Sequence, residues 1–257
     1  MFYQLKVNSP YLAIAMSYAE ITFKDKSLIK RWLQRQRLNS AIKLCSRSLH
    51  PPENICDFGA GNGELCKLLA ARYKNAKITC YEPTPILLSE AKDNLNAISS
   101  VKFCQDIRTI TPGTFNVVFC LEVFEHLPPA EMADALQTIS DLLNSEGIII
   151  IGVPVEIGIP AIYKGIFRML RRYGEFDANI KNVALSFIGR PPINRPIAEI
   201  APNFRFHHEH MGFHYRHFNT TLSSFFRLLN VSASPFASLG PWLMPEVYFV
   251  AQKIPRK

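Results

Sequence analysis

Apolar and polar positions follow a repeating order from residue 54 onward. Short apolar runs typical of strands alternate with longer segments in which apolar residues return every three or four positions, the period of an amphipathic helix. These patterns predict strands over residues 54–58, 77–81, 101–104, 115–120 and 147–153, and helices over residues 63–73, 85–96 and 130–144. Strands that alternate with helices of about a dozen residues need crossover connections, so we predict an α/β fold with a doubly wound, mainly parallel sheet.

The segments on either side of this alternation have a different character. Residues 10–50 are basic with helical periodicity and predict two helices that end at Pro51-Pro52. After the fifth strand the chain becomes basic, aromatic and broken by prolines, with helical fragments over 159–173 and 179–188. A helix over 220–229 and strands over 231–235 and 246–252 follow, and Gly240-Pro241 between these strands favours an antiparallel pair. We therefore predict a helical extension (1–50), a main domain (51–155 and 216–257) and an inserted lid or substrate element (156–215).

Composition supports a folded domain with a sizeable core. Of the 257 residues, 48% are hydrophobic and 19% are charged, which excludes disordered and collagen-like chains. All six cysteines lie in the first half without the spacing of a zinc ribbon, which indicates structural thiols in a reducing compartment. The first residues lack a signal-peptide pattern, and the apolar run over 147–163 contains Glu156 and two prolines. We expect a cytoplasmic protein without a membrane span.

A glycine-rich turn follows the first predicted strand. Asp57, Gly59, Gly61 and Gly63 are spaced two apart, so backbone can approach a ligand beside a helix N-terminus. Position 64 is Glu where a dinucleotide fingerprint needs the third glycine, and no Gly-Lys-Ser/Thr follows, so dinucleotides and a Walker loop are disfavoured. Glu82 ends the second strand, where a carboxylate can accept both ribose hydroxyls. The alternative is that Glu82 caps the next helix.

This combination resembles the class I S-adenosylmethionine-dependent methyltransferases, and further motifs occur in the same order. Residues 103–107 are similar to the family's third motif, and residues 115–128 to the fourth-strand signature of the ubiquinone and menaquinone biosynthesis methyltransferases. The resemblance implies S-adenosylmethionine as cofactor and a seven-stranded sheet whose final strand is antiparallel. It implies that the loop around Gly59, Ala60 and Gly61 binds the methionine end and Glu82 the ribose. It implies adenine contacts from Asp106 and Ile107 and a covering wall of Cys120, Leu121 and Glu122, and the predicted cofactor-binding residues also include Asp57, Gly63 and Pro83.

Histidines supply the candidates for acceptor chemistry. His126 follows the fourth strand, and an imidazole with an ordinary pKa near 6.5 suits proton removal; the alternative is that it braces the next helix. Residues 206–217 hold five of the seven histidines, but their spacing fits no HxxxH helix and Gly212 interrupts them, so we predict no metal site. The predicted substrate-pocket residues are Tyr163, His207, His210 and His214, with surface or packing roles as the alternative.

The predicted helix near residue 160 is basic and amphipathic. Helical spacing puts four cations on one face, Lys164, Arg168, Arg171 and Arg172, largely opposite Ile162, Ile166, Met169 and Leu170. With a net charge of +8, this composition suits peripheral contact with an anionic membrane. The alternative is a lid helix that packs its apolar face on the sheet and exposes its cations.

These observations together predict a methyltransferase that uses S-adenosylmethionine and modifies O, N or C of a small-molecule or lipid-like biosynthetic intermediate. The positive charge also suits an RNA-directed methyltransferase, but no Asn/Asp-Pro-Pro-Tyr/Phe motif follows the fourth strand, so nucleic acid is disfavoured. A non-catalytic cofactor-binding scaffold at a membrane surface is the third alternative. The sequence does not indicate the oligomeric state.

Overall fold

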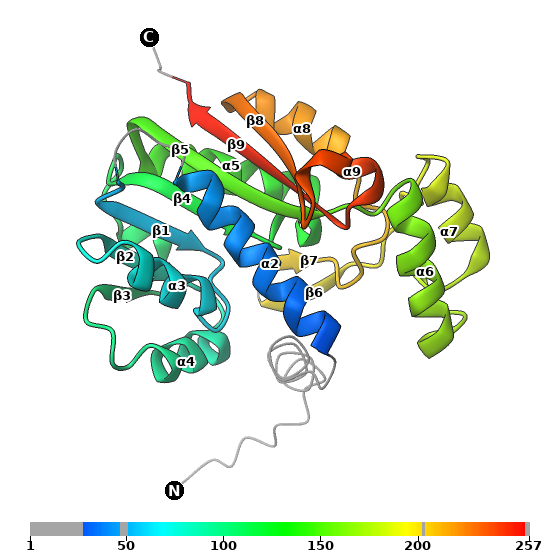
Figure 1. The fold of residues 1–257 in the computed structure, drawn as a ribbon, viewed down its shortest axis with the longest axis horizontal. Coiled ribbons are helices and arrows are strands. Elements are labelled where there is room, and N and C mark those ends of the chain that lie inside the picture. Colours follow the sequence, from blue (N-terminus) through cyan, green and yellow to red (C-terminus); the bar gives the residue numbers. More distant parts are fainter. Residues whose placement is uncertain (1–27, 47–50, 202–203, 255–257) are drawn as a thin grey trace, which may run out of the picture.

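A seven-stranded sheet forms the centre of the computed structural model, which describes residues 28–46, 51–201 and 204–254 (Figure 1). Its strand order is β3-β2-β1-β4-β5-β9-β8. The strands are β1 (Asn54–Phe58), β2 (Lys77–Tyr81), β3 (Val101–Cys104), β4 (Phe115–Leu121), β5 (Leu143–Pro154), β8 (Phe226–Ser234) and β9 (Glu246–Lys253). Neighbours among β1 to β5 are parallel, whereas β9 is antiparallel to both β5 and β8. The predicted fold class, including the antiparallel final strand, is confirmed.

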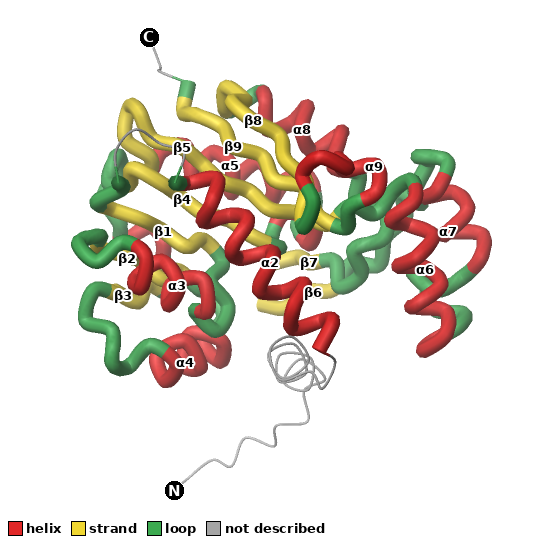
Figure 2. The backbone as a smooth tube through the Cα atoms, viewed as in Figure 1, coloured by secondary structure: helices red, strands yellow, loops and turns green. Residues whose placement is uncertain are grey.

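Helices cover both faces of this sheet (Figure 2). One core cluster joins the sheet to α2 (Leu28–Cys45), α3 (Glu64–Arg72) and α4 (Pro85–Asn94), and the other joins it to α5 (Pro129–Leu142) and α8 (Tyr215–Ser223). Alternation along β5 explains the two clusters, because Ile149 and Ile151 pack on the α5 side while Ile150 packs on the α2 side. A central strand of this kind is apolar on both faces, as the sequence run predicts.

One predicted helix near the C-terminus has the wrong bounds. The pattern predicts a helix over 220–229, but α8 ends at Ser223 and β8 begins at Phe226. Along β8, Phe226 is buried and the next five positions alternate between exposed and half-buried. The run therefore also suits a strand, and pairing with β9 decides between the two states.

The segment between β5 and α8 contains α6 (Ile159–Arg172) and α7 (Ile180–Phe187), close to the predicted helical fragments. It also contains a two-stranded sheet that the sequence pattern did not indicate, formed by β6 (Ala198–Ala201) and β7 (Phe204–Phe206). In Figure 1, α6 and α7 project to the right of the main sheet. Of the two helices predicted before residue 51, α2 is described, and the first lies outside the described residues.

The sheet places its ligand-binding edge between β1 and β4. Crossovers leave β1 toward β2 on one side and return to β4 on the other, and ligands bind at such a reversal, beyond the carboxyl ends of the strands. All six cysteines are free thiols, five of them buried, as expected. Within residues 28–46, 51–201 and 204–254, none of the helices has the length and apolar character needed to cross a bilayer.

Candidate active site

The turn between β1 and α3 adopts a conformation that requires glycine. Gly59, Gly61 and Gly63 have φ angles of 79°, 54° and 80°, in the left-handed region that other residues rarely adopt. A Cβ atom on Gly59 would lie 2.5 Å from a methyl group of Val123, whereas a Cβ on Gly61 would meet nothing within 4 Å. Gly59 therefore packs tightly, and Gly61 leaves its face of the turn open.

Glu82 binds this turn from the end of β2. Its Oε2 accepts the Gly61 N–H at 2.9 Å, and its Oε1 accepts the Thr84 N–H at 2.9 Å at the start of α4. Burial raises the pKa of this carboxyl, and the Thr84 and Gly61 N–H groups oppose that rise. The predicted helix-capping contact and the contact with the glycine turn thus coexist, and the ribose contact of Glu82 stays a prediction.

A cavity of about 120 Å³, here called the glycine-loop cavity, opens above this turn. Six predicted cofactor residues line it: Asp57, Gly59, Ala60, Gly61, Leu121 and Glu122. Three lining residues from α2 were missed, namely Gln34, Arg37 and Leu38. No motif of α2 signals them, because their place here depends on how α2 packs across the sheet.

The other predicted cofactor residues do not line this cavity. They are Gly63, Glu82, Pro83, Asp106, Ile107 and Cys120. Asp106 has an exposed carboxylate that accepts two hydrogen bonds from the Arg108 guanidinium, at 2.8 and 2.7 Å. Arg108 lowers the pKa of Asp106. The adenine contact of Asp106 therefore stays a prediction.

Asp57 is a buried carboxyl at the floor of the glycine-loop cavity. Only 3% of its surface is exposed, and the Cys66 Sγ lies 3.4 Å from its Oδ2. Desolvation raises the pKa of Asp57 to about 7, because burial disfavours the charged form.

A second cavity of about 200 Å³, here called the His210 cavity, shares two lining residues with the first, Arg37 and Glu122. Lys164, His210 and Glu246 also line it. Arg37 Nη1 lies 3.1 Å from Glu122 Oε2, and its Nη2 donates to Glu246 Oε1 at 2.6 Å. The two cavities therefore adjoin at one ion pair.

Three of the predicted histidines converge beside the His210 cavity. The His126 Nδ1 lies 2.6 Å from the carbonyl oxygen of His207, and the His207 N–H donates to the carbonyl oxygen of His126 at 2.8 Å. The His126 and His210 Nε2 atoms lie 3.2 Å apart. Since a carbonyl only accepts, His126 carries its proton on Nδ1. His207 thus orients the His126 ring. Of these three histidines, His210 is the one that lines the His210 cavity.

The other two predicted substrate residues lie outside the His210 cavity. Tyr163 is 40% exposed on α6, and its hydroxyl donates to the Leu243 carbonyl at 3.3 Å. His214 caps the N-terminus of α8 and stacks on His217 with ring centroids 4.0 Å apart. Their positions give no further support for a contact with substrate, which stays a prediction.

Two cations of α6, Lys164 and Arg168, face inward, whereas Arg171 and Arg172 are exposed, so the predicted orientation of this helix is wrong for the first two. Glu156 is fully buried and binds Lys164 Nζ at 3.0 Å and Arg168 Nη1 at 2.8 Å, while Asp177 binds Arg172 Nη2 at 2.7 Å. The exposed side chains of α6 are instead largely apolar: Tyr163, Ile166, Phe167 and Leu170. Leaving a buried carboxylate unpaired is more unfavourable than exposing an apolar side chain, so the buried acids determine which face turns inward.

Residues 29–228 match the family described as a methyltransferase domain. Because this match covers most of the chain, the chain belongs to the methyltransferase domain family, and the family resemblance of its motifs is confirmed.

Curated relatives are similar over shorter stretches. A malonyl-[acyl-carrier protein] O-methyltransferase of Anoxybacillus flavithermus is 36% identical over 67 residues, which is 26% of each chain. A trans-aconitate 2-methyltransferase of Escherichia coli is 27% identical over 122 residues, which is 46% of each chain. The chain thus spans less than half the length of these relatives.

Solved structures share the fold over nearly the whole chain. The N-methyltransferase NodS from Bradyrhizobium japonicum, in complex with S-adenosyl-L-homocysteine, superposes with a TM-score of 0.60 at 13% identity and covers 95% of this chain and 98% of its own. The 1,6-didemethyltoxoflavin-N1-methyltransferase of Burkholderia thailandensis superposes with a TM-score of 0.57 at 13% identity over 99% of both chains. Identity this low supports the common fold alone.

Proposed function

We propose that this chain transfers a methyl group from S-adenosylmethionine, bound in the glycine-loop cavity, to a small molecule in the His210 cavity. The observation that carries the proposal is the shared wall: Arg37 and Glu122 line both cavities, so a cofactor and an acceptor would meet at one place. Methyl transfer from a sulfonium is an in-line displacement, and its rate depends mainly on such alignment.

The size and polarity of the His210 cavity favour a small polar acceptor group. Its volume of about 200 Å³ accommodates a small molecule or the reactive end of a longer one. Charged groups of both signs line it, with Arg37 and Lys164 beside Glu122 and Glu246. The curated relatives are named for trans-aconitate, a small molecule, and for malonyl-[acyl-carrier protein], a small acyl group attached to a protein. The acceptor atom is O, N or C of such a small-molecule or lipid-like intermediate.

His126 is a poor candidate for the general base that the sequence indicated. It is 3% exposed and is not among the residues that line the His210 cavity. Desolvation lowers its pKa to about 4, so its neutral imidazole is a weak base at neutral pH. His210 lines the His210 cavity, which supports it as the histidine that contacts the acceptor in this proposal.

The test is a methylation assay with labelled S-adenosylmethionine on separated small-molecule, lipid and RNA fractions of a cell extract, with S-adenosylhomocysteine as product. We expect product with the small-molecule or lipid fraction. Product with the RNA fraction alone would establish the RNA-directed alternative. Cofactor binding without product from any fraction would favour a non-catalytic scaffold, and absent cofactor binding would overturn the proposal entirely.

A further inference from the structure

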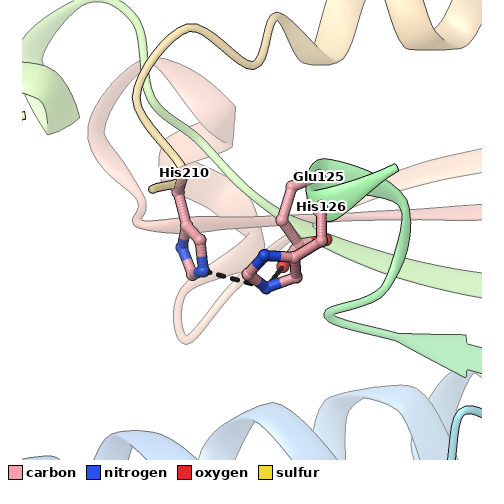
Figure 3. A group of neighbouring side chains, drawn as sticks. All are labelled: Glu125, His126 and His210. Carbon is pink, nitrogen blue, oxygen red and sulfur yellow. Dashed lines mark hydrogen bonds and ion pairs between the residues drawn. The ribbon is translucent and has the colours of Figure 1, made fainter. Parts of the chain in front are cut away.

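Three side chains with metal-ligating atoms meet where the loop after β4 contacts the loop after β7. Glu125 and His126 lie in the short 3-10 helix Phe124–His126, and His210 comes from a segment 84 residues later. One ligand atom from each residue lies within 4.8 Å of the other two (Figure 3). The 3-10 helix and the β7 loop are held together by the paired hydrogen bonds of His126 and His207.

Glu125 is the group whose position most needs an explanation. It is fully buried, and neither carboxylate oxygen has a hydrogen-bond partner. The nearby Arg195 guanidinium does not supply one, because its Nη2 donates to the backbone carbonyls of Glu125 and Glu209. A buried carboxylate without hydrogen bonds is unfavourable unless a cation or a proton neutralises it.

His126 is arranged as histidine ligands usually are. Its Nδ1–H is held by the His207 carbonyl, and its ring stacks on Phe206 with centroids 4.4 Å apart. This fixes the ring and leaves the Nε2 lone pair directed at the cluster, where Glu125 Oε1 lies 3.8 Å away. A hydrogen bond from the outer ring nitrogen to a carbonyl or carboxylate is the usual second contact of a metal-bound imidazole.

The spacing of the two imidazoles also suits a shared ion. Their Nε2 atoms are 3.2 Å apart. Two nitrogens each about 2.0–2.1 Å from one ion at a tetrahedral angle would be about 3.3–3.4 Å apart, close to this spacing. The same distance also suits a direct hydrogen bond from His210 to His126, which would leave Glu125 unsatisfied.

Although the spacing of residues 206–217 predicted no metal site, we propose that Glu125, His126 and His210 bind one divalent transition-metal ion of the Zn²⁺ class. Two imidazoles and one carboxylate form a ligand set that Zn²⁺ accepts, whereas Mg²⁺ and Ca²⁺ prefer oxygen ligands throughout. Three protein ligands leave a coordination position for water or an acceptor oxygen. His210 also lines the His210 cavity, which places the metal site next to the proposed acceptor.

The experiment is a calorimetric titration of the chelator-treated full chain with Zn²⁺, and with Co²⁺ for its visible absorption in a nitrogen and oxygen site. We expect one ion per chain, with affinity at least about 100-fold weaker in His210→Ala and in Glu125→Gln. His217→Ala is the matched control, because His217 is exposed and outside the cluster; it should bind like the wild type. Circular dichroism checks that each variant is folded.

Either of two results would overturn the metal site: no stoichiometric binding to the wild type, or unchanged binding in His210→Ala. If Glu125→Gln does not fold, His210→Asn provides the second ligand test. The titration needs no methyl donor or acceptor, so its outcome is separate from that of the proposed function. S-adenosylhomocysteine affinity, measured on the same samples, should be equal in wild type and His210→Ala.

Discussion

Arg37 on α2 forms an ion pair with Glu122 at the end of β4, with 3.1 Å between Nη1 and Oε2. Glu122 has a φ angle of 56°, which is uncommon for a residue with a side chain. The Glu122 carboxylate is thereby held between the two cavities, and Arg37 also binds Glu246 on β9. One cation on α2 thus pairs with two acids, Glu122 after β4 and Glu246 on β9.

Arg37→Ala should lower the free energy of unfolding by about 3–5 kcal/mol, because removing one partner of a buried ion pair leaves charge without compensation. Urea denaturation followed by circular dichroism measures the change. Arg35→Ala is the control, since Arg35 is exposed on the same helix and should alter stability by less than about 0.5 kcal/mol. Equal stability of the two variants would show that the ion pair contributes nothing.

Gly61→Arg should abolish binding of S-adenosylmethionine while the protein stays folded. The new side chain would start in open space on the cavity side of the turn and fill the glycine-loop cavity. Calorimetry with S-adenosylhomocysteine measures the loss. Gly113→Arg is a matched control, because Gly113 also has a positive φ angle and no atom near its Cβ position, yet it does not line the cavity. Unchanged affinity for S-adenosylhomocysteine in Gly61→Arg would show that the cofactor does not bind in this cavity.

Glu82→Ala should weaken cofactor binding by about 10-fold to 150-fold, which corresponds to about 1.5–3 kcal/mol for lost hydrogen bonds to a charged group. The loss has two sources, the predicted ribose contact and the Gly61 N–H that Glu82 accepts. Comparing S-adenosylhomocysteine with its 2′-deoxy analogue separates them, because the ribose contact predicts that Glu82→Ala no longer distinguishes the two ligands. Asp93→Ala on the exposed side of α4 is the control.

Asp57 should make the free protein less stable as pH rises. Its pKa of about 7 in the folded state exceeds its value of about 4 in an unfolded chain, so its contribution is fully present below pH 4 and is lost as pH rises through 7. The side chain of Asp57→Asn does not ionise, so this variant keeps its stability as pH rises. It should be more stable than wild type at pH 8 by about 2–4 kcal/mol. The difference should vanish near pH 4. Denaturation at both pH values measures it, and a difference independent of pH would contradict the assignment.

Glu156→Gln should destabilise α6 by leaving Lys164 and Arg168 without their buried carboxylate, at about 3–5 kcal/mol. Hydrogen exchange should quicken along α6 before it does in the sheet. Glu175→Gln is the control, because Glu175 lies exposed between α6 and α7. Unaltered exchange in Glu156→Gln would show that this buried ion network does not hold the helix.

The same network changes which residues can test the predicted membrane contact. Arg168→Gln should reduce stability rather than vesicle binding, because Arg168 is bound to Glu156 and Asp177. Arg171 is exposed and lies over the Phe167 ring rather than beside a buried acid, so it is a cation of α6 that can reach a lipid headgroup. Co-sedimentation of Arg171→Gln with anionic vesicles therefore measures any electrostatic contact made by this helix.

The sequence by itself determined the sheet, the glycine turn and the family. Strand and helix periods are local, and the φ angles of Gly59, Gly61 and Gly63 follow from spacing that can be read directly. Local signals failed where two states are close in energy, as at residues 226–229, where pairing with β9 selects a strand.

Only the tertiary structure decided how distant segments combine around the site. Arg37 reaches Glu122 because α2 packs across the sheet, and His210 reaches His126 across 84 residues because paired backbone hydrogen bonds join their loops. The inward orientation of Lys164 and Arg168 depends on Glu156 being buried, which helical periodicity does not show. Amphipathic spacing identifies two faces of a helix, but the charges buried opposite it determine which face turns inward.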